Sequence, residues 1–207
     1  MHPKEAKKER VGTGRVSHLI LKNSCLIIGE KFDETSPVAR IIQDPLNCCF
    51  ILYPGHNSTK INQYLPVTIN ECKEKNIVVF VIDATWSCAK SLMRESHILH
   101  NIPRISYELD PTQRSKFVIK HQPAKECLST CESLYWLLHF FNIHQVENLV
   151  FKEHDNLLHI LDRICIFQLE CASDPQLKRY RPGIFKKTHQ KRESLKWKTR
   201  KIYFESN

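Results

Sequence analysis

Glycine is scarce in this chain of 207 residues, which contains only five. None of the five belongs to a Gly-x-Gly-x-x-Gly turn or to a Walker A loop. Such loops cradle the phosphates of dinucleotides and nucleoside triphosphates, so these two modes of nucleotide binding are excluded. A nucleotide-like ligand would have to be held by a different backbone geometry.

Long apolar runs are also missing, because charged residues interrupt every apolar stretch well before the length of a membrane span. The first ten residues are mostly charged, which is unlike a signal peptide. Nine cysteines are present, but none forms a Cys-x-x-Cys pair, which argues against a zinc ribbon or a redox motif. We therefore expect a cytoplasmic protein with no membrane segment, whose cysteines are reduced and mostly buried.

The charge is concentrated at one end of the chain. The net charge is +9, and residues 178–201 contain eleven Lys and Arg residues but one acid, which leaves 20 basic and 21 acidic residues elsewhere. Basic groups interleaved with aromatic rings suit phosphate contacts and base stacking, although a solubilising disordered tail is the alternative. We expect a domain over residues 1–175 and a basic extension over 176–207. The aromatic residues in or beside the basic segment are Tyr180, Phe185, Trp197 and Tyr203.

Apolar patterning predicts strands that alternate with helices, and hence an α/β fold with a mostly parallel sheet covered by helices on both faces. The run Ile77–Ile82 is typical of a strand buried on both faces. The polar segment Glu108–Gln122 has a possible hairpin arm at Lys116–Lys120, and a break is possible in the last helix. The predicted strands are Cys25–Gly29, Cys48–Tyr53, Ile77–Ile82 and Pro103–Tyr107. The predicted helices are Arg15–Asn23, Val38–Gln43, Pro66–Lys75, Ser87–His100, Leu128–Asn142 and Val146–Cys171.

Asp83-Ala84-Thr85-Trp86 directly follows the Ile77–Ile82 strand. Ligands of open α/β sheets bind beyond the carboxyl ends of the strands, so this junction is a candidate site. A purely structural alternative is that Asp83 caps the next helix and Trp86 fills the core, and Thr85 is itself a suitable N-cap. Ser129-x-x-Glu132 similarly forms a capping box before an apolar run.

The Asp83–Trp86 sequence, followed by Ala89, Lys90 and Leu92, resembles the signature of the DTW-domain family, whose members are similar to tRNA-uridine aminocarboxypropyltransferases. Four further blocks occur in the order expected of that family, and together the blocks span residues 2–132. They are His2-Pro3-Lys4-Glu5 with Gly12-Thr13-Gly14-Arg15; Leu52-Tyr53-Pro54-Gly55; Pro103-Arg104 with Arg114-Ser115-Lys116-Phe117-Val118-Ile119-Lys120; and Leu128-Ser129-Thr130-Cys131-Glu132.

The resemblance implies a SPOUT-like fold tied in a trefoil knot, a feature that composition could not have suggested. It implies that the knot loops hold S-adenosyl-L-methionine, and that the enzyme transfers its 3-amino-3-carboxypropyl group to N3 of a uridine in tRNA and releases methylthioadenosine. Because N3 is hidden in a base pair, the acceptor is expected in a loop. The cysteine cluster that many relatives carry ahead of the His-Pro block is not seen before His2, so no metal is expected. The partner is tRNA, and the protein is expected to be a monomer.

The resemblance also implies roles for individual residues. Asp83 is the candidate catalytic residue, either as the base that accepts the N3 proton or as an anchor for the amino group or sulfonium of the donor. The turn before the Ser129 helix offers backbone N–H groups to a carboxylate. Two alternatives remain open: a SPOUT-like RNA methyltransferase, and a non-catalytic RNA-binding protein with a decayed cofactor site. Candidate cofactor-binding residues are Tyr53, Pro54, Gly55, Thr85, Trp86, Leu128, Ser129 and Thr130. Candidate substrate-binding residues are Arg15, Arg114, Ser115 and Lys120, of which the last three could instead form a solvated arm.

Overall fold

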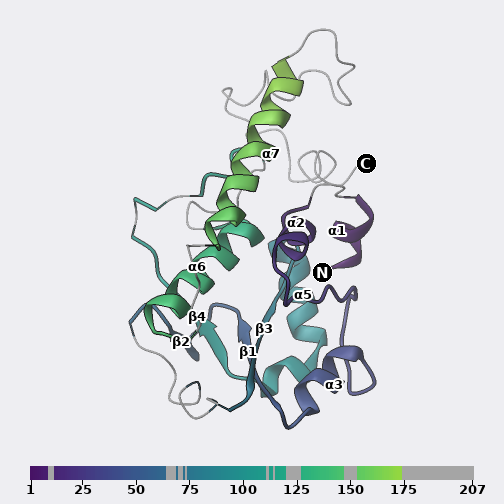
Figure 1. The fold of residues 1–207 in the computed structure, drawn as a ribbon. Coiled ribbons are helices and arrows are strands. Elements are labelled where there is room, and N and C mark those ends of the chain that lie inside the picture. The colour runs from purple at the N-terminus through teal and green to yellow at the C-terminus, as the bar shows by residue number, and fades with distance from the viewer. Residues whose placement is uncertain are drawn as a thin grey trace.

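A computed structural model of the chain shows a four-stranded parallel sheet between two groups of helices (Figure 1). The strand order is β2-β4-β1-β3, and every adjacent pair is parallel. The structure describes residues 1–8, 12–63, 69, 72, 74–110, 112–113, 115–119, 127–146 and 153–173. The strands are β1 (Asn47–Leu52), β2 (Ser58–Lys60), β3 (Asn76–Val81) and β4 (Arg104–Ser106). The helices are α1 (Pro3–Lys8), α2 (Thr13–Ile20), α3 (Pro37–Gln43), α5 (Trp86–Glu95), the 3-10 helix η1 (His97–Asn101), α6 (Thr130–Ile143) and α7 (Asp155–Ser173).

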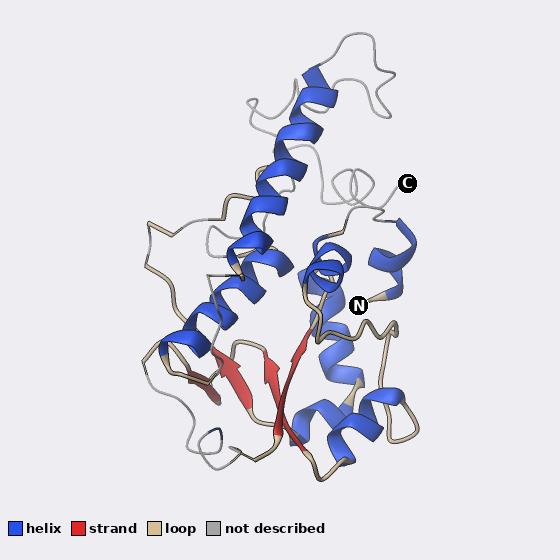
Figure 2. Ribbon diagram, in the orientation of Figure 1, coloured by secondary structure: helices blue, strands red, loops and turns tan. Residues whose placement is uncertain are grey.

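Helices cover both faces of the sheet, as the apolar patterning predicts (Figure 2). Successive strand residues point to opposite faces. Accordingly, Ile51 of β1 packs with α3 and α5, whereas its neighbour Phe50 packs with Leu137 and Phe141 of α6. The predicted α/β class and parallel sheet are therefore confirmed, and the trefoil knot stays a prediction.

The strand predicted to be buried on both faces lies at an edge of the described sheet. β3 pairs with β1, and its side chains are half-buried. The fully buried strand residues, Phe50, Ile51 and Ile105, belong to the interior strands β1 and β4. An apolar run therefore predicted the strand correctly but not its position in the sheet.

Cys25–Gly29 is not a strand, contrary to the prediction. The segment has no regular structure, and it pairs with the first residue of the chain. The amino group of Met1 donates to the carbonyl oxygen of Ile27 at 2.7 Å, and the Gly29 N–H donates to the Met1 carbonyl at 3.2 Å. One of its side chains still joins the core, since Ile27 packs against the α3–α5 side, whereas Ile28 is exposed.

Three other predictions need correction. The helix predicted over Ser87–His100 ends at Glu95 and continues as η1. The described part of the possible hairpin arm, residues 116–119, contains no strand. The cysteines are not all reduced, because Cys48 and Cys72 form a disulfide, and among the remaining described cysteines only Cys131 and Cys165 are buried. Cys72 follows β2 by twelve residues and is brought beside β1, a pairing that no short spacing motif could reveal.

Several predictions fall on parts of the chain that lie outside the described residues. Most of the predicted helix Pro66–Lys75 and the junction before α7 lie outside them, as does everything after Ser173, including the basic segment. No helix among the described residues is long and apolar enough to span a membrane.

Candidate functional site

Two sequence blocks meet at the carboxyl edge of the sheet because β1 and β3 are parallel neighbours. Leu52 pairs with Val81, so Tyr53-Pro54-Gly55 and Asp83-Ala84-Thr85-Trp86 leave adjacent strands at the same level. This edge is where open α/β proteins place their ligands.

Asp83 is the residue that joins the blocks. Its carboxylate oxygen Oδ1 accepts a hydrogen bond of 2.6 Å from the hydroxyl of Thr130, the first residue of α6. Its backbone carbonyl accepts the N–H of His2 at 2.9 Å. Asp83, in the signature block, thus contacts both the block at the start of α6 and the N-terminal block.

The second carboxylate oxygen of Asp83 is a buried acceptor with no partner among the described residues. Asp83 itself is only 8% exposed. A buried unsatisfied oxygen is costly, and in native proteins such atoms usually mark a water, an ion or a ligand. An anionic oxygen in this position suits a cationic or N–H-donating ligand.

The start of α6, next to Asp83, presents hydrogen-bond donors, whereas Asp83 presents an acceptor. Ser129 and Glu132 form a complete capping box, as predicted, which accounts for the N–H groups of these two residues. The N–H groups of Thr130 and Cys131 have no acceptor among the described residues. Free N–H groups and the positive end of the helix dipole favour a carboxylate or phosphate at this point.

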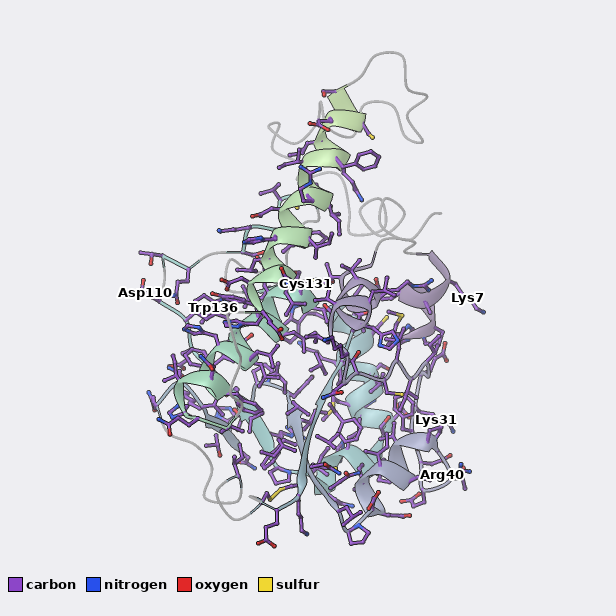
Figure 3. All side chains as sticks on the ribbon, in the orientation of Figure 1. Lys7, Lys31, Arg40, Asp110, Cys131 and Trp136 are labelled. Carbon is purple, nitrogen blue, oxygen red and sulfur yellow. A yellow bond between two sulfur atoms is a disulfide. The ribbon has the colours of Figure 1, made fainter. Side chains whose placement is uncertain are left out.

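Helix α2 closes one side of the site. Gly14 of α2 lies against the Asp83 carboxylate, and Cys131 of α6 donates to the Thr13 carbonyl at 3.3 Å and lies 3.2 Å from the Ser17 hydroxyl oxygen. Figure 3 shows Cys131 on the part of α6 near α2. Burial raises the pKa of the Cys131 thiol to about 11, with the nearby carboxylates adding to the effect. This cysteine is therefore a neutral packing residue at pH 7 and not a thiolate nucleophile.

The structural alternative for the signature block is wrong in both parts. Thr85, not Asp83, caps α5, since its hydroxyl oxygen accepts the N–H of Cys88 at 3.4 Å. Trp86 does not fill the core, because it is 38% exposed on the first turn of α5. Its indole is therefore partly exposed at the start of α5, three residues after Asp83.

A cation that the sequence analysis did not assign to the site lies beside the turn after β1. The Arg104 guanidinium of β4 stacks over the Tyr53 ring at 5.7 Å. A β-carbon on Gly55 would stand 3.5 Å from Arg104 Nη1, an ordinary van der Waals contact, so Gly55 lies beside this guanidinium but is not required by it. The Pro103-Arg104 pair of the third block was the available signal.

The candidate substrate-binding residues divide into three cases. Arg15 donates to the Ala6 carbonyl at 2.8 Å and thereby ties α1 to α2. Ser115 donates to Glu132 Oε2 at 2.8 Å, which places it beside the start of α6. Arg114 and Lys120 lie outside the described residues.

Two residues of the N-terminal block also belong to the site, although no role for them was predicted from sequence. His2 is buried, and burial lowers the pKa of its imidazole, so the ring is neutral at pH 7. Gly14 is required by its contact with Asp83. Both positions fall within motif blocks, but their contacts cross some 70–80 positions of sequence, which no local pattern reveals. In the part of the chain that the structure describes, no group of three or more His, Cys, Asp or Glu residues could hold a metal ion.

The DTW domain family matches residues 1–169. The chain belongs to this family. This DTW-domain protein is 28% identical over 192 residues to tRNA-uridine aminocarboxypropyltransferase 2 of Mus musculus, which covers 90% of the chain and 60% of the mouse protein. It is 25% identical over 177 residues to the protein of the same name from Macaca fascicularis, covering 85% of the chain and 55% of that protein. The chain thus spans less than two thirds of these curated relatives, and no solved structure matches it.

Proposed function

We propose that this DTW-domain protein is a tRNA-uridine aminocarboxypropyltransferase. In this reaction the 3-amino-3-carboxypropyl group of S-adenosyl-L-methionine moves to N3 of a loop uridine, and methylthioadenosine is released. Two relatives with that printed name support the proposal. The structural observation that carries it is the hydrogen bond between Asp83 and Thr130, which leaves one buried carboxylate oxygen available next to a helix N-terminus.

The residues present fit the proposed donor. S-adenosyl-L-methionine carries a sulfonium and an ammonium group, both positive, together with a carboxylate. Asp83 Oδ2 is suited to a positive group, and the N–H groups of Thr130 and Cys131 are suited to the carboxylate. Bound there, the donor would supply a carbon activated by the adjacent sulfonium. Trp86, the Tyr53–Gly55 turn and the Leu128–Ser129 turn are proposed to hold its remaining parts.

Asp83 has one of two roles in this proposal. The uridine N3 loses a proton when its new bond to carbon forms, and Asp83 Oδ2 is the proposed acceptor. Alternatively, the carboxylate holds the donor amino group or sulfonium and so aligns the reacting atoms. In either role, Thr130 fixes one carboxylate oxygen and thereby orients the other.

The proposed binding of tRNA rests on the positively charged residues of the chain. The eleven basic residues of the 178–201 segment would contact phosphates without reading sequence, and Arg114, Ser115 and Lys120 would contact the acceptor region. Specificity would come from an unpaired uridine that can enter the site. We further propose the SPOUT-like knot, a cytoplasmic location, a monomeric state and a boundary near residue 175 between the domain and its basic extension.

The deciding experiment incubates the protein with S-adenosyl-L-methionine and unmodified tRNA, and then analyses nucleosides and by-products by mass spectrometry. We expect methylthioadenosine and aminocarboxypropyl-uridine. Asp83→Asn should lower the rate by about 100-fold or more, because the amide can neither accept the proton nor balance a cation. Asp33→Asn is the matched control, since Asp33 also accepts a threonine hydroxyl, at 2.7 Å, but lies in the loop before α3.

Other products would contradict the proposal. S-adenosylhomocysteine with a methylated nucleoside would identify a methyltransferase. An absence of calorimetric binding at millimolar S-adenosyl-L-methionine, with retained tRNA binding, would identify an RNA-binding protein with a decayed site.

A further inference from the structure

Lys116 is an exposed residue whose backbone N–H and carbonyl groups both make hydrogen bonds. Its N–H donates to Glu132 Oε1 at 2.6 Å. Its carbonyl accepts the Val118 N–H at 2.8 Å and lies 4.0 Å from Cys165 Sγ of α7. The side chain is exposed. An irregular segment therefore presents one lysine from a fixed backbone position.

Glu132 does more than cap its helix. A capping box needs only the contacts between Ser129 and Glu132 at the start of α6. The Glu132 carboxylate, which is 3% exposed, also accepts the Ser115 hydroxyl at 2.8 Å and the Lys116 N–H, sixteen residues earlier in the chain. A buried carboxylate that receives this many hydrogen bonds is a rigid anchor, since losing any donor leaves a buried anionic oxygen unsatisfied.

This anchor fixes Lys116 near the candidate site, because Glu132 lies two residues after Thr130, the partner of Asp83. A lysine ammonium is a compact charge of the kind that binds phosphate. We propose that Lys116 contacts a phosphate of the RNA that enters the site, and that Glu132 is the positioning residue that holds it there. The inference rests on the proposed tRNA substrate and adds a contact residue and its support.

The test is direct binding of unmodified tRNA, measured by fluorescence anisotropy over 50–200 mM salt. Lys116→Gln should weaken binding and lower the slope of log K against log salt by about 1, the signature of one lost phosphate contact. The control is Lys31→Gln, an exposed lysine near α3 (Figure 3). It should leave the slope unchanged. An unchanged slope for Lys116→Gln would overturn the proposal.

A double-mutant cycle tests the positioning role of Glu132. If Glu132 acts through Lys116, Glu132→Gln lowers the salt slope in the parent protein but not in the Lys116→Gln background. If Glu132 is only a cap, its replacement lowers thermal stability and leaves the slope unchanged in both backgrounds. Ser115→Ala is the milder second variant, because it removes one contact of the anchor but keeps the capping box. Ser115→Ala should also lower the salt slope. If this variant leaves the slope unchanged, the positioning role of Glu132 is contradicted.

The binding assay contains no S-adenosyl-L-methionine, so it separates this inference from the proposed reaction. A protein that binds tRNA through Lys116 but forms no aminocarboxypropyl-uridine would refute the reaction and keep the contact. A protein that catalyses the reaction with a salt slope independent of Lys116 would refute the contact and keep the reaction.

Discussion

Gly14 is packed so tightly against Asp83 that a β-carbon at position 14 would stand 2.3 Å from the Asp83 carboxyl carbon. The same β-carbon would stand 2.5 Å from Oδ2, the oxygen that has no partner among the described residues. Helix α2 thus approaches the carboxylate through a residue without a side chain. Any larger residue would have to displace the group proposed to do the chemistry.

Gly14→Ala should therefore lower the transfer rate by about tenfold or more while α2 stays helical. Alanine is intrinsically favoured over glycine in a helix by about 1 kcal/mol, so a loss cannot be attributed to helix propensity. The measurement is methylthioadenosine release, together with circular dichroism. Leu19→Ala, which changes an exposed residue of the same helix, is the control. Full activity of Gly14→Ala would show that the Asp83 position is not critical.

Thr130→Val should lower the transfer rate more than Thr130→Ser. Valine has nearly the shape of threonine but cannot donate to Asp83 Oδ1, so a buried anionic oxygen loses its partner. Serine keeps the hydroxyl and should stay within a few-fold of the parent. The comparison uses kcat and KM for S-adenosyl-L-methionine, with unfolding measured in parallel. Equal activity of the two variants would mean that this hydrogen bond does not orient the carboxylate.

The elements that sequence predicted well are those with local signals. Helix α3, predicted over Val38–Gln43, begins after the N-cap Ser36, and the Ser129–Glu132 capping box starts α6, because capping chemistry operates within one helical turn. The apolar runs at β1 and β3 likewise became strands. Family resemblance then indicated which strand ends to examine.

The contacts that make the site could not be predicted in this way. Asp83 meets Thr130 across 47 residues, and Glu132 reaches back sixteen residues to Lys116. Such pairings depend on the order of strands in the sheet and on how α2 and α6 pack, neither of which follows from hydrophobic periodicity. The Cys48–Cys72 disulfide was missed for the same reason.

Trp86→Ala should reduce transfer without a large loss of stability. Trp86 is 38% exposed, so its removal creates no core cavity, and a change in the free energy of unfolding of more than about 1 kcal/mol is not expected. Urea unfolding and methylthioadenosine release measure the two effects. Phe167→Ala, an exposed aromatic on α7, is the control for generic loss of surface area. A destabilised but catalytically normal Trp86→Ala protein would favour a packing role for the indole.

The protein should lose stability between pH 9 and pH 11 through Cys131. Burial raises the pKa of this thiol from 9.0 to about 11, so the folded state binds its proton more tightly than the unfolded state. The contribution is fully present below pH 9 and is lost as the pH rises toward 11, by about 2–3 kcal/mol. Urea unfolding at pH 8 and pH 10.5 measures it. Cys131→Ser, which does not titrate in this range, should show a smaller loss, and equal losses would contradict a buried neutral thiol.

Deletion of residues 178–207 should weaken tRNA binding and flatten its salt dependence. The segment carries eleven Lys and Arg residues against one acid in positions 178–201, so its loss removes several possible phosphate contacts. Anisotropy titrations over 50–200 mM salt compare the full chain with the deletion. A solubilising tail would instead leave the slope unchanged and reduce only solubility.

Charge and stacking in this segment can be separated without shortening the chain. Replacing its eleven basic residues by Gln should lower the salt slope, because fewer counterions are released on binding. Replacing Tyr180, Phe185, Trp197 and Tyr203 by Ala should weaken binding at a constant slope, because base stacking does not release counterions. If the aromatic variant binds as tightly as the parent while the glutamine variant does not, the segment is a purely electrostatic contact, and the stacking part of the interpretation fails.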